Sequence, residues 1–139
     1  MKYAGTYEIF ASQMFWANFF PSAFNGVFDF YTYEKLKGYY AFYWYGFLYD
    51  CEKEIASINE VENIYSLCGV DKNGKATIIL TYYSDNDALP NKEISLDLDE
   101  NATYEIYKGD NEHNGELVAV TDNLSFEMEL YSMVLIKEK

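Results

Sequence analysis

Aromatic side chains are concentrated at one end of this 139-residue chain. Residues 1–50 hold 20 of its 27 Phe, Trp and Tyr residues, whereas residues 51–139 hold 19 of its 23 acidic residues. Rings of this size are normally buried against other parts of a protein. The chain therefore divides into two parts: an aromatic-rich segment, residues 1–52, and an acidic domain, residues 53–139.

In the acidic domain, apolar and polar residues alternate. Ile94, Leu96 and Leu98, for example, are separated by Ser95 and Asp97. Such alternation predicts half-buried strands. Short strands separated by turn signals predict an antiparallel β-sandwich, here of about seven to eight strands, so the fold class is mainly β. The expected strands are Lys53–Ile58, Asn63–Val70, Ala76–Ser84, Lys92–Leu98, Thr103–Lys108, Glu116–Thr121, Leu124–Glu129 and Tyr131–Lys137.

A hairpin between the second and third of these strands carries the strongest local signal. The turn Asp71–Lys75 contains Asn73-Gly74. Asn-Gly supplies the positive φ that a tight hairpin needs.

The aromatic-rich segment has the pattern of helix, strand and helix. A first helix is expected from Thr6 to Pro21, a buried strand over Gly26–Phe30, and a second helix from a Thr32 cap to about Cys51. Aromatic rings surround the second helix on nearly every side, which is typical of a helix buried on several sides. The segment therefore has more apolar surface than its three elements can cover.

Charge and cysteine content limit the possible partners. The net charge is −13, and all ten basic residues are lysines. Nucleic acids and anionic membranes attract clusters of Lys and Arg, so neither is expected as a partner. We find no membrane-spanning apolar run and no signal peptide. Cys51 and Cys68 are too few for a disulfide framework, so free thiols and a cytoplasmic location are expected.

The segment Asn25–Thr32, followed by Glu34–Phe42, resembles a known pattern. It is similar to the last strand and last helix of the (β/α)8 barrel in clan A glycoside hydrolases, particularly the β-xylosidase-like enzymes of family 39. In that pattern a G-L-F-D strand end precedes a T-x-E-P-x-K-x-Y-Y-A-F helix start. Here Val27 replaces the Leu, and Leu36 stands about where the Pro would be. These enzymes continue into a C-terminal β-sandwich, whose last strand is similar to Tyr131–Ile136.

The resemblance implies that the chain lacks the catalytic residues. Retaining enzymes of this clan use two carboxylates on earlier barrel strands, which would lie before Met1. A complete barrel needs about 200 residues or more, so the chain is expected to be a barrel remnant with its sandwich. Asn59-Glu60 matches the letters of the acid/base motif, but it falls in the linker and receives no catalytic role. No cofactor is expected.

Asp29 and Trp44 are the candidate substrate-binding residues. Asp29 would lie at the end of a barrel strand, where such enzymes bind substrate, although a carboxylate that fixes the loop is the simpler interpretation. Trp44 and its neighbours could stack on sugar rings, but aromatic residues at helical spacing usually pack in a core.

No metal site is expected. His113 has no second His or Cys at a ligand spacing and is interpreted as a solvated loop residue. The loop Asp71–Gly74 lacks oxygen ligands at the positions a calcium loop needs. Asp85-Asn86-Asp87 could contribute to a calcium site, and a plain polar turn is the favoured alternative.

Two functions remain open. The first is a non-catalytic accessory module of a glycoside hydrolase, which packs against a catalytic barrel. The second is an independent carbohydrate-binding sandwich, which would need exposed rings on a sheet face or a loop rim. A large apolar helix face usually marks an interface, so we also predict a two-fold homodimer of the isolated chain. The expected interface residues are Phe15, Trp16, Phe19, Tyr39, Tyr40, Tyr43, Trp44 and Phe47.

Overall fold

The computed structural model describes residues 27–29 and 31–139, and this part of the chain is mainly β. It contains one helix, α1 (Lys37–Tyr49), and eight strands. All eight predicted strands are confirmed, with bounds that differ by a few residues. The strands are β1 (Lys53–Ile55), β2 (Ile64–Val70), β3 (Ala76–Tyr82), β4 (Lys92–Ser95), β5 (Tyr104–Gly109), β6 (Asn114–Thr121), β7 (Ser125–Met128) and β8 (Met133–Glu138).

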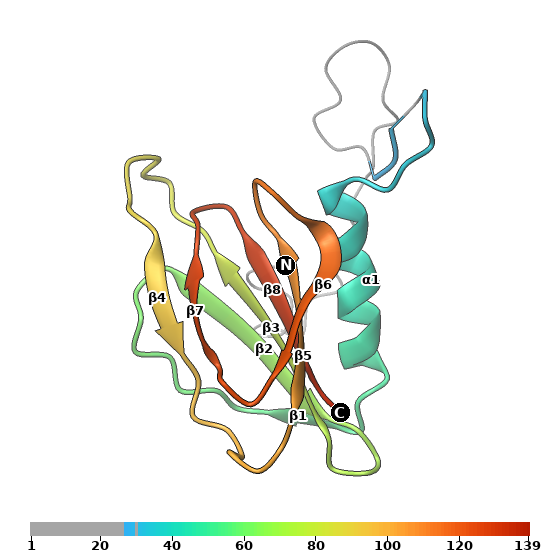
Figure 1. The fold of residues 1–139 in the computed structure, drawn as a ribbon, viewed down its shortest axis with the longest axis vertical. Coiled ribbons are helices and arrows are strands. Elements are labelled where there is room, and N and C mark those ends of the chain that lie inside the picture. The colour runs from blue at the N-terminus through green and yellow to red at the C-terminus, as the bar shows by residue number, and fades with distance from the viewer. Residues whose placement is uncertain (1–26, 30) are drawn as a thin grey trace.

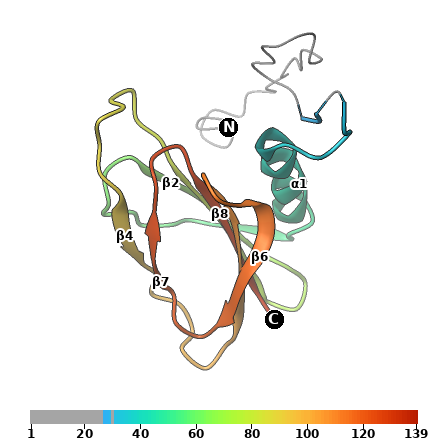
Figure 2. The same ribbon diagram turned by 45° about the horizontal axis from the view of Figure 1, so that its top comes forward.

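The strands form two sheets in which every pairing is antiparallel (Figure 1). The large sheet has six strands in the order β1-β2-β3-β8-β5-β6, and the small sheet pairs β4 with β7. Strand β8 therefore lies between β3 and β5, although it comes last in the sequence. The small sheet covers one face of the large sheet, as predicted for a sandwich (Figure 2).

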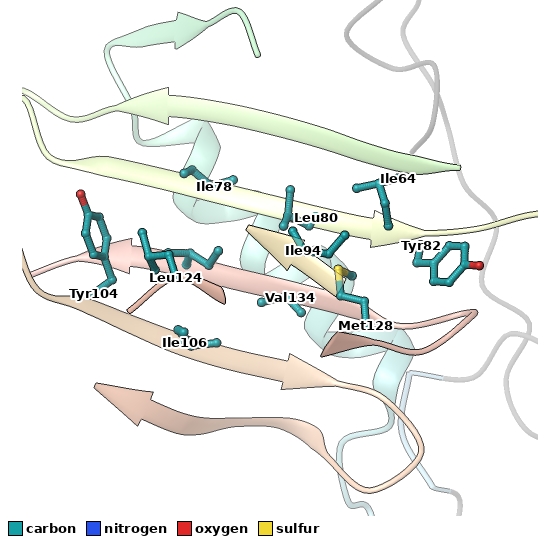
Figure 3. Close-up of a cluster of buried hydrophobic side chains, with 11 residues drawn as sticks. Ile64, Ile78, Leu80, Tyr82, Ile94, Tyr104, Ile106, Leu124, Met128 and Val134 are labelled. Carbon is teal, nitrogen blue, oxygen red and sulfur yellow. The ribbon is translucent and has the colours of Figure 1, made fainter. Parts of the chain in front are cut away.

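The hydrophobic core lies between the two sheets (Figure 3). Alternate residues of β3 and β8 point into it, because successive side chains of a strand face opposite sides of the sheet. Tyr82 and Ile136 are fully buried there. The cluster consists of Ile64, Ile78, Leu80, Tyr82, Ile94, Tyr104, Ile106, Leu124, Met128, Val134 and Ile136.

Helix α1 packs on the opposite face of the large sheet, so the described fold has three layers (Figure 2). It contacts β2, β3 and β6. Trp44 is the buried residue of the helix, and Leu135 of β8, which points away from the sandwich core, is equally inaccessible. Within the described helix, Trp44 is the fully buried residue, and Phe42, on roughly the opposite side, is partly buried, so the helix is covered less completely than predicted.

The segment before α1 differs from the expected strand and helix cap. Phe28 forms an isolated β-bridge with Lys35 instead of belonging to a strand, and its side chain is exposed. The helix begins after Leu36 without a side-chain cap. Thr32 instead lies in a turn, where its N–H donates to the Asp29 carboxylate at 2.8 Å. The helix predicted from Thr6 to Pro21 lies outside the described residues.

The Asp71–Lys75 turn forms the predicted hairpin between β2 and β3. Its one positive φ is at Gly74, at 82°. The Asp71 carboxylate accepts hydrogen bonds from the N–H groups of Asn73 and Lys75, at 2.8 and 2.9 Å. Asp71 therefore stabilises a turn, as a short polar side chain does in an Asx turn.

Candidate functional site

Helix α1 carries two pairs of tyrosines, Tyr39 with Tyr43 and Tyr45 with Tyr49, each spaced four residues apart and the two pairs on different flanks of the helix. Tyr43, Tyr45 and Tyr49 are 51%, 37% and 84% exposed. Tyr39 is partly buried and stacks on Tyr43, with ring centroids 5.8 Å apart and an angle of 20° between the planes. We call Tyr39, Tyr43, Tyr45 and Tyr49 the α1 aromatic face. It is a candidate interaction surface, because exposed apolar patches of this kind are uncommon on isolated domains.

Two lysines contact aromatic rings of α1, one of them within this face and one outside it. The ammonium group of Lys35 lies 4.7 Å from the centroid of the Tyr39 ring, and that of Lys137 lies 4.2 Å from the Phe47 ring. Cation–π contacts of this geometry are favourable. They help to hold the rings in place at both ends of the helix.

The predicted interface residues on α1 differ in their access to solvent. Tyr43 is exposed, whereas Tyr39, Tyr40 and Phe47 are partly buried. Trp44 is 1% exposed and can contact neither a partner nor a sugar in this structure. The other three predicted residues, Phe15, Trp16 and Phe19, lie outside the described residues.

Asp29, the other candidate for substrate binding, holds a turn. Its carboxylate accepts hydrogen bonds from the N–H groups of Tyr31 and Thr32, both at 2.8 Å. The bonds from Thr32 and Tyr31 lower the pKa of Asp29 below its ordinary value. This geometry is that of a loop-fixing carboxylate.

A second pair of exposed rings lies in two loops of the sandwich. Tyr83 follows β3 and is 41% exposed, and Tyr131 lies between β7 and β8 and is 53% exposed. Their ring centroids are 5.9 Å apart with an angle of 61° between the planes. We call these residues the tyrosine pair. The sequence alone does not reveal this pair, because the two residues are 48 positions apart and neither has an aromatic partner at strand or helix spacing.

Carboxylates hold the hydroxyl groups of the tyrosine pair. The Tyr83 hydroxyl donates to Asp85 Oδ1 at 2.8 Å. The Tyr131 hydroxyl donates to Asp87 Oδ1, and the Ser84 carbonyl oxygen lies 3.1 Å from the same hydroxyl oxygen. The bond to Asp87, together with burial and nearby negative charge, raises the pKa of Tyr131 to about 12. Asp85 and Asp87 thus belong to a polar turn that supports two rings.

The remaining polar candidates have structural roles. The His113 Nδ1 lies 2.7 Å from Oδ1 of Asp110, which is a buried residue. The same oxygen accepts hydrogen bonds from the backbone N–H groups of Glu112 and His113. Burial opposes ionisation of Asp110, but these hydrogen bonds outweigh it and lower its pKa. Among the described residues, no three His, Cys, Asp or Glu side chains are grouped closely enough to hold a metal ion.

A narrow groove separates the C-terminal end of α1 from β1 and β2. Its volume is about 190 Å³, and its lining includes Tyr45, Tyr49, Lys53 and Leu67. Both cysteines border the groove as free thiols, as predicted. Burial raises the pKa of the Cys68 thiol, so it is a poor nucleophile. The groove continues the α1 aromatic face toward the sheet.

The part of the chain that the structure describes contains no helix that is both long and apolar enough to cross a membrane.

No family model and no curated protein sequence matches this chain. Its fold is similar to parts of two solved xylanases. One is a glycoside hydrolase family 30 subfamily 8 xylanase from Clostridium acetobutylicum, with a TM-score of 0.59, 13% identity, and coverage of 83% of this chain and 31% of the xylanase. The other is a family 30 endoxylanase from Clostridium papyrosolvens, with a TM-score of 0.55, 17% identity, and coverage of 76% and 28%.

Because the sequence identities are low, these likenesses show a shared fold and nothing beyond it. The chain spans less than a third of each xylanase and matches the C-terminal β-domain of the family 30 enzymes. The expectation of a glycoside hydrolase-related fold is therefore confirmed. The finer expectations, family 39 and a fragment that retains the end of a barrel, stay predictions.

Proposed function

We propose that this chain is a non-catalytic accessory module of a glycoside hydrolase and that it packs against a catalytic (β/α)8 barrel through the α1 aromatic face. The observation that carries this proposal is that three tyrosines, Tyr43, Tyr45 and Tyr49, remain exposed on a helix that packs on its own sheet through Trp44. Tyrosines are frequent anchors of protein interfaces.

Two exposed glycines of α1 support the proposal. Gly38 and Gly46 are accessible to solvent, and a Cβ at Gly46 would meet no atom within 4 Å. Glycine inside a helix lowers helix stability by about 1 kcal/mol relative to alanine. Nothing within the described residues requires glycine at position 46. A partner backbone that approaches α1 closely would account for it.

The fold likeness supports the identity of the partner. Segments of similar fold make up about 30% of each of the two xylanases, and the rest of each xylanase has no counterpart in this chain. The resemblance of residues 25–42 to the end of a clan A barrel points to the same kind of partner. The module would bury its apolar helix and leave catalysis to the two carboxylates of the barrel.

Site-specific crosslinking in the source cells tests the proposal. A photoreactive phenylalanine analogue replaces Tyr43 in the endogenous gene, and the crosslinked peptides are identified by mass spectrometry. We expect crosslinks to a (β/α)8 barrel with two catalytic glutamates, on the same polypeptide or on another. The same analogue at Leu117 of β6, which is 46% exposed, is the matched control and should not crosslink to the barrel.

Four results would contradict this function. The first three are that the analogue at position 43 forms no crosslink, that it crosslinks only to a second copy of this chain, and that it crosslinks to a protein without a glycosidase barrel. Hydrolysis of xylan by the purified chain alone would also be incompatible with a non-catalytic module.

The second candidate function is an independent carbohydrate-binding sandwich. It requires rings exposed on a sheet face or a loop rim, and the tyrosine pair meets this requirement. Tyr83 and Tyr131 lie in loops of the sandwich and are about half exposed.

A further inference from the structure

The tyrosine pair is held firmly where two loops meet. The N–H of Tyr131 donates to the carbonyl oxygen of Tyr82, the last residue of β3, at 2.9 Å. The N–H of Tyr83 donates to the Asn63 carbonyl oxygen at 3.0 Å. The loops that follow β3 and β7 lie at the same end of the sandwich (Figure 1). Both rings therefore keep fixed positions relative to the large sheet.

The two rings contact each other edge to face. Their centroids are 5.9 Å apart, so no space between them could enclose a small cation. Each ring is about half exposed, and a tyrosine combines a flat apolar body with a polar tip. The shape of this surface suits a flat ligand that lies over the rings, such as a sugar with its C–H groups toward them.

One carboxylate lies at the hydroxyl group of each ring. Asp85 and Asp87 each accept one hydroxyl group of the pair through Oδ1, and an ionised carboxylate has about four acceptor sites on its two oxygens. Both residues are exposed, so they can also accept hydroxyl groups of a ligand. The net charge of −13 disfavours nucleic acids and acidic sugars. The chemistry that fits is an uncharged molecule rich in hydroxyl groups.

The backbone conformation at Tyr131 is one that tyrosine seldom adopts. Its φ is 65°, in the left-handed region, within a turn in which the Ser132 N–H donates to the Glu129 carbonyl oxygen at 3.2 Å. Glycine is the residue that favours this position of such a turn. Tyrosine is therefore less favourable there for the backbone, and its ring is what distinguishes it from glycine.

We propose that the tyrosine pair, together with Asp85 and Asp87, binds a neutral polysaccharide, with sugar rings stacked on Tyr83 and Tyr131 and hydroxyl groups donating to the two carboxylates. This inference deepens the second candidate function, and it does not depend on packing of α1 against a barrel.

Affinity electrophoresis tests the site. The full chain is run through native gels that contain arabinoxylan, mixed-linkage β-glucan or glucomannan, with a polysaccharide-free gel as the reference. We expect at least one polysaccharide to retard the wild-type chain. Tyr131→Gly and Tyr83→Ala should each weaken this binding about tenfold or more, since aromatic stacking on a ring ligand is typically worth such a factor.

Three controls separate binding from stability. Tyr131→Gly loses the hydroxyl bond to Asp87 but places glycine at a left-handed backbone position, so its midpoint of urea unfolding should change little. Tyr131→Phe keeps the ring and should keep most of the retardation. Tyr49→Ala removes a ring that is 84% exposed on α1 and should bind as the wild type does.

The proposal is overturned if none of the three polysaccharides retards the chain. It is also overturned if Tyr131→Gly and Tyr83→Ala bind like the wild type, if Tyr131→Phe loses binding as fully as Tyr131→Gly, or if Tyr49→Ala loses it. The crosslinking of position 43 uses another surface and another readout, so failure of one proposal leaves the other unaffected.

Discussion

The ring of Tyr40 lies against the backbone of Gly115, so close that no larger residue fits there. A Cβ at Gly115 would come within 2.3 Å of Cγ and Cδ1 of Tyr40, and the φ of Gly115 is 94°. This contact joins α1 to the start of β6, at the edge of the large sheet. Glycine is required here both for space and for backbone conformation.

Gly115→Ala should destabilise the fold by about 2–4 kcal/mol, because backbone strain and overpacking act together. Urea unfolding measures the loss. Gly74→Ala is the matched control: Gly74 also has a positive φ, 82°, but nothing lies within 4 Å of its Cβ position. The Gly74→Ala variant should lose about 1 kcal/mol of stability, because it affects only the backbone conformation. Equal costs for the two variants would refute the role of Tyr40.

Trp44→Ala should destabilise the fold by about 3–5 kcal/mol, because it leaves a large cavity between α1 and the sheet. Tyr49→Ala on the same helix should change stability by no more than about 0.5 kcal/mol, since that ring is exposed. Thermal and urea unfolding check both values. A Trp44→Ala variant as stable as the wild type would mean that α1 is not packed on the sheet in solution.

The isolated chain should self-associate through the α1 aromatic face, most simply as a two-fold dimer. Sedimentation velocity at tens of micromolar should show a dimer for the wild type. Replacing two exposed rings, Tyr43→Ser with Tyr45→Ser, should shift the chain to monomer by removing apolar contact area.

Val120→Lys is the control for this dimer. Val120 is 48% exposed on β6, an edge strand of the large sheet, and exposed edge strands can pair with each other. This variant should remain a dimer if α1 forms the contact. A wild-type monomer, or dissociation by Val120→Lys alone, would disprove the predicted interface.

Tyr131 should make stability depend on pH in the alkaline range. Its pKa is raised from the ordinary value of 10.0 to about 12 in the folded chain. The hydroxyl bond to Asp87 therefore stabilises the folded state fully below pH 10, and this contribution is lost as the pH rises from 10 to about 12. Urea midpoints measured across that range should fall more for the wild type than for Tyr131→Phe.

Asp87→Asn should bring the pKa of Tyr131 back toward 10, because it removes the acceptor charge. Tyrosinate absorbance, taken as the difference between each chain and its Tyr131→Phe counterpart, reports this pKa. A titration that is the same in the wild type and in the Asp87→Asn variant would show that the carboxylate does not hold the hydroxyl.

The strands could be predicted because their signals are local. Alternation within β4 and the glycine at position 74 depend on residues only a few positions apart. The start of α1 could not be predicted in this way. Thr32 has the right side chain for a helix cap, but Asp29 accepts its N–H, and Tyr33 then adopts a φ of 59°. A competing turn thus delays the helix to Lys37.

The candidate sites depend on contacts between distant residues. Trp44 and Tyr43 are neighbours of the same chemical kind, and only the position of the sheet decides that one is buried and the other exposed. Tyr83 and Tyr131 meet because β3 pairs with β8 across more than 50 residues of sequence. Sequence periodicity cannot predict strand order, since that order depends on how non-local surfaces fit together.

The central place of β8 affects how the protein is made. Residues beyond Ser132 supply the strand that joins β3 to β5. A ribosome must therefore extrude nearly all of the described chain before the two halves of the large sheet can be linked. Until then the edges of β3 and β5 that pair with β8 are unpaired, and unpaired strand edges make a folding intermediate prone to aggregation.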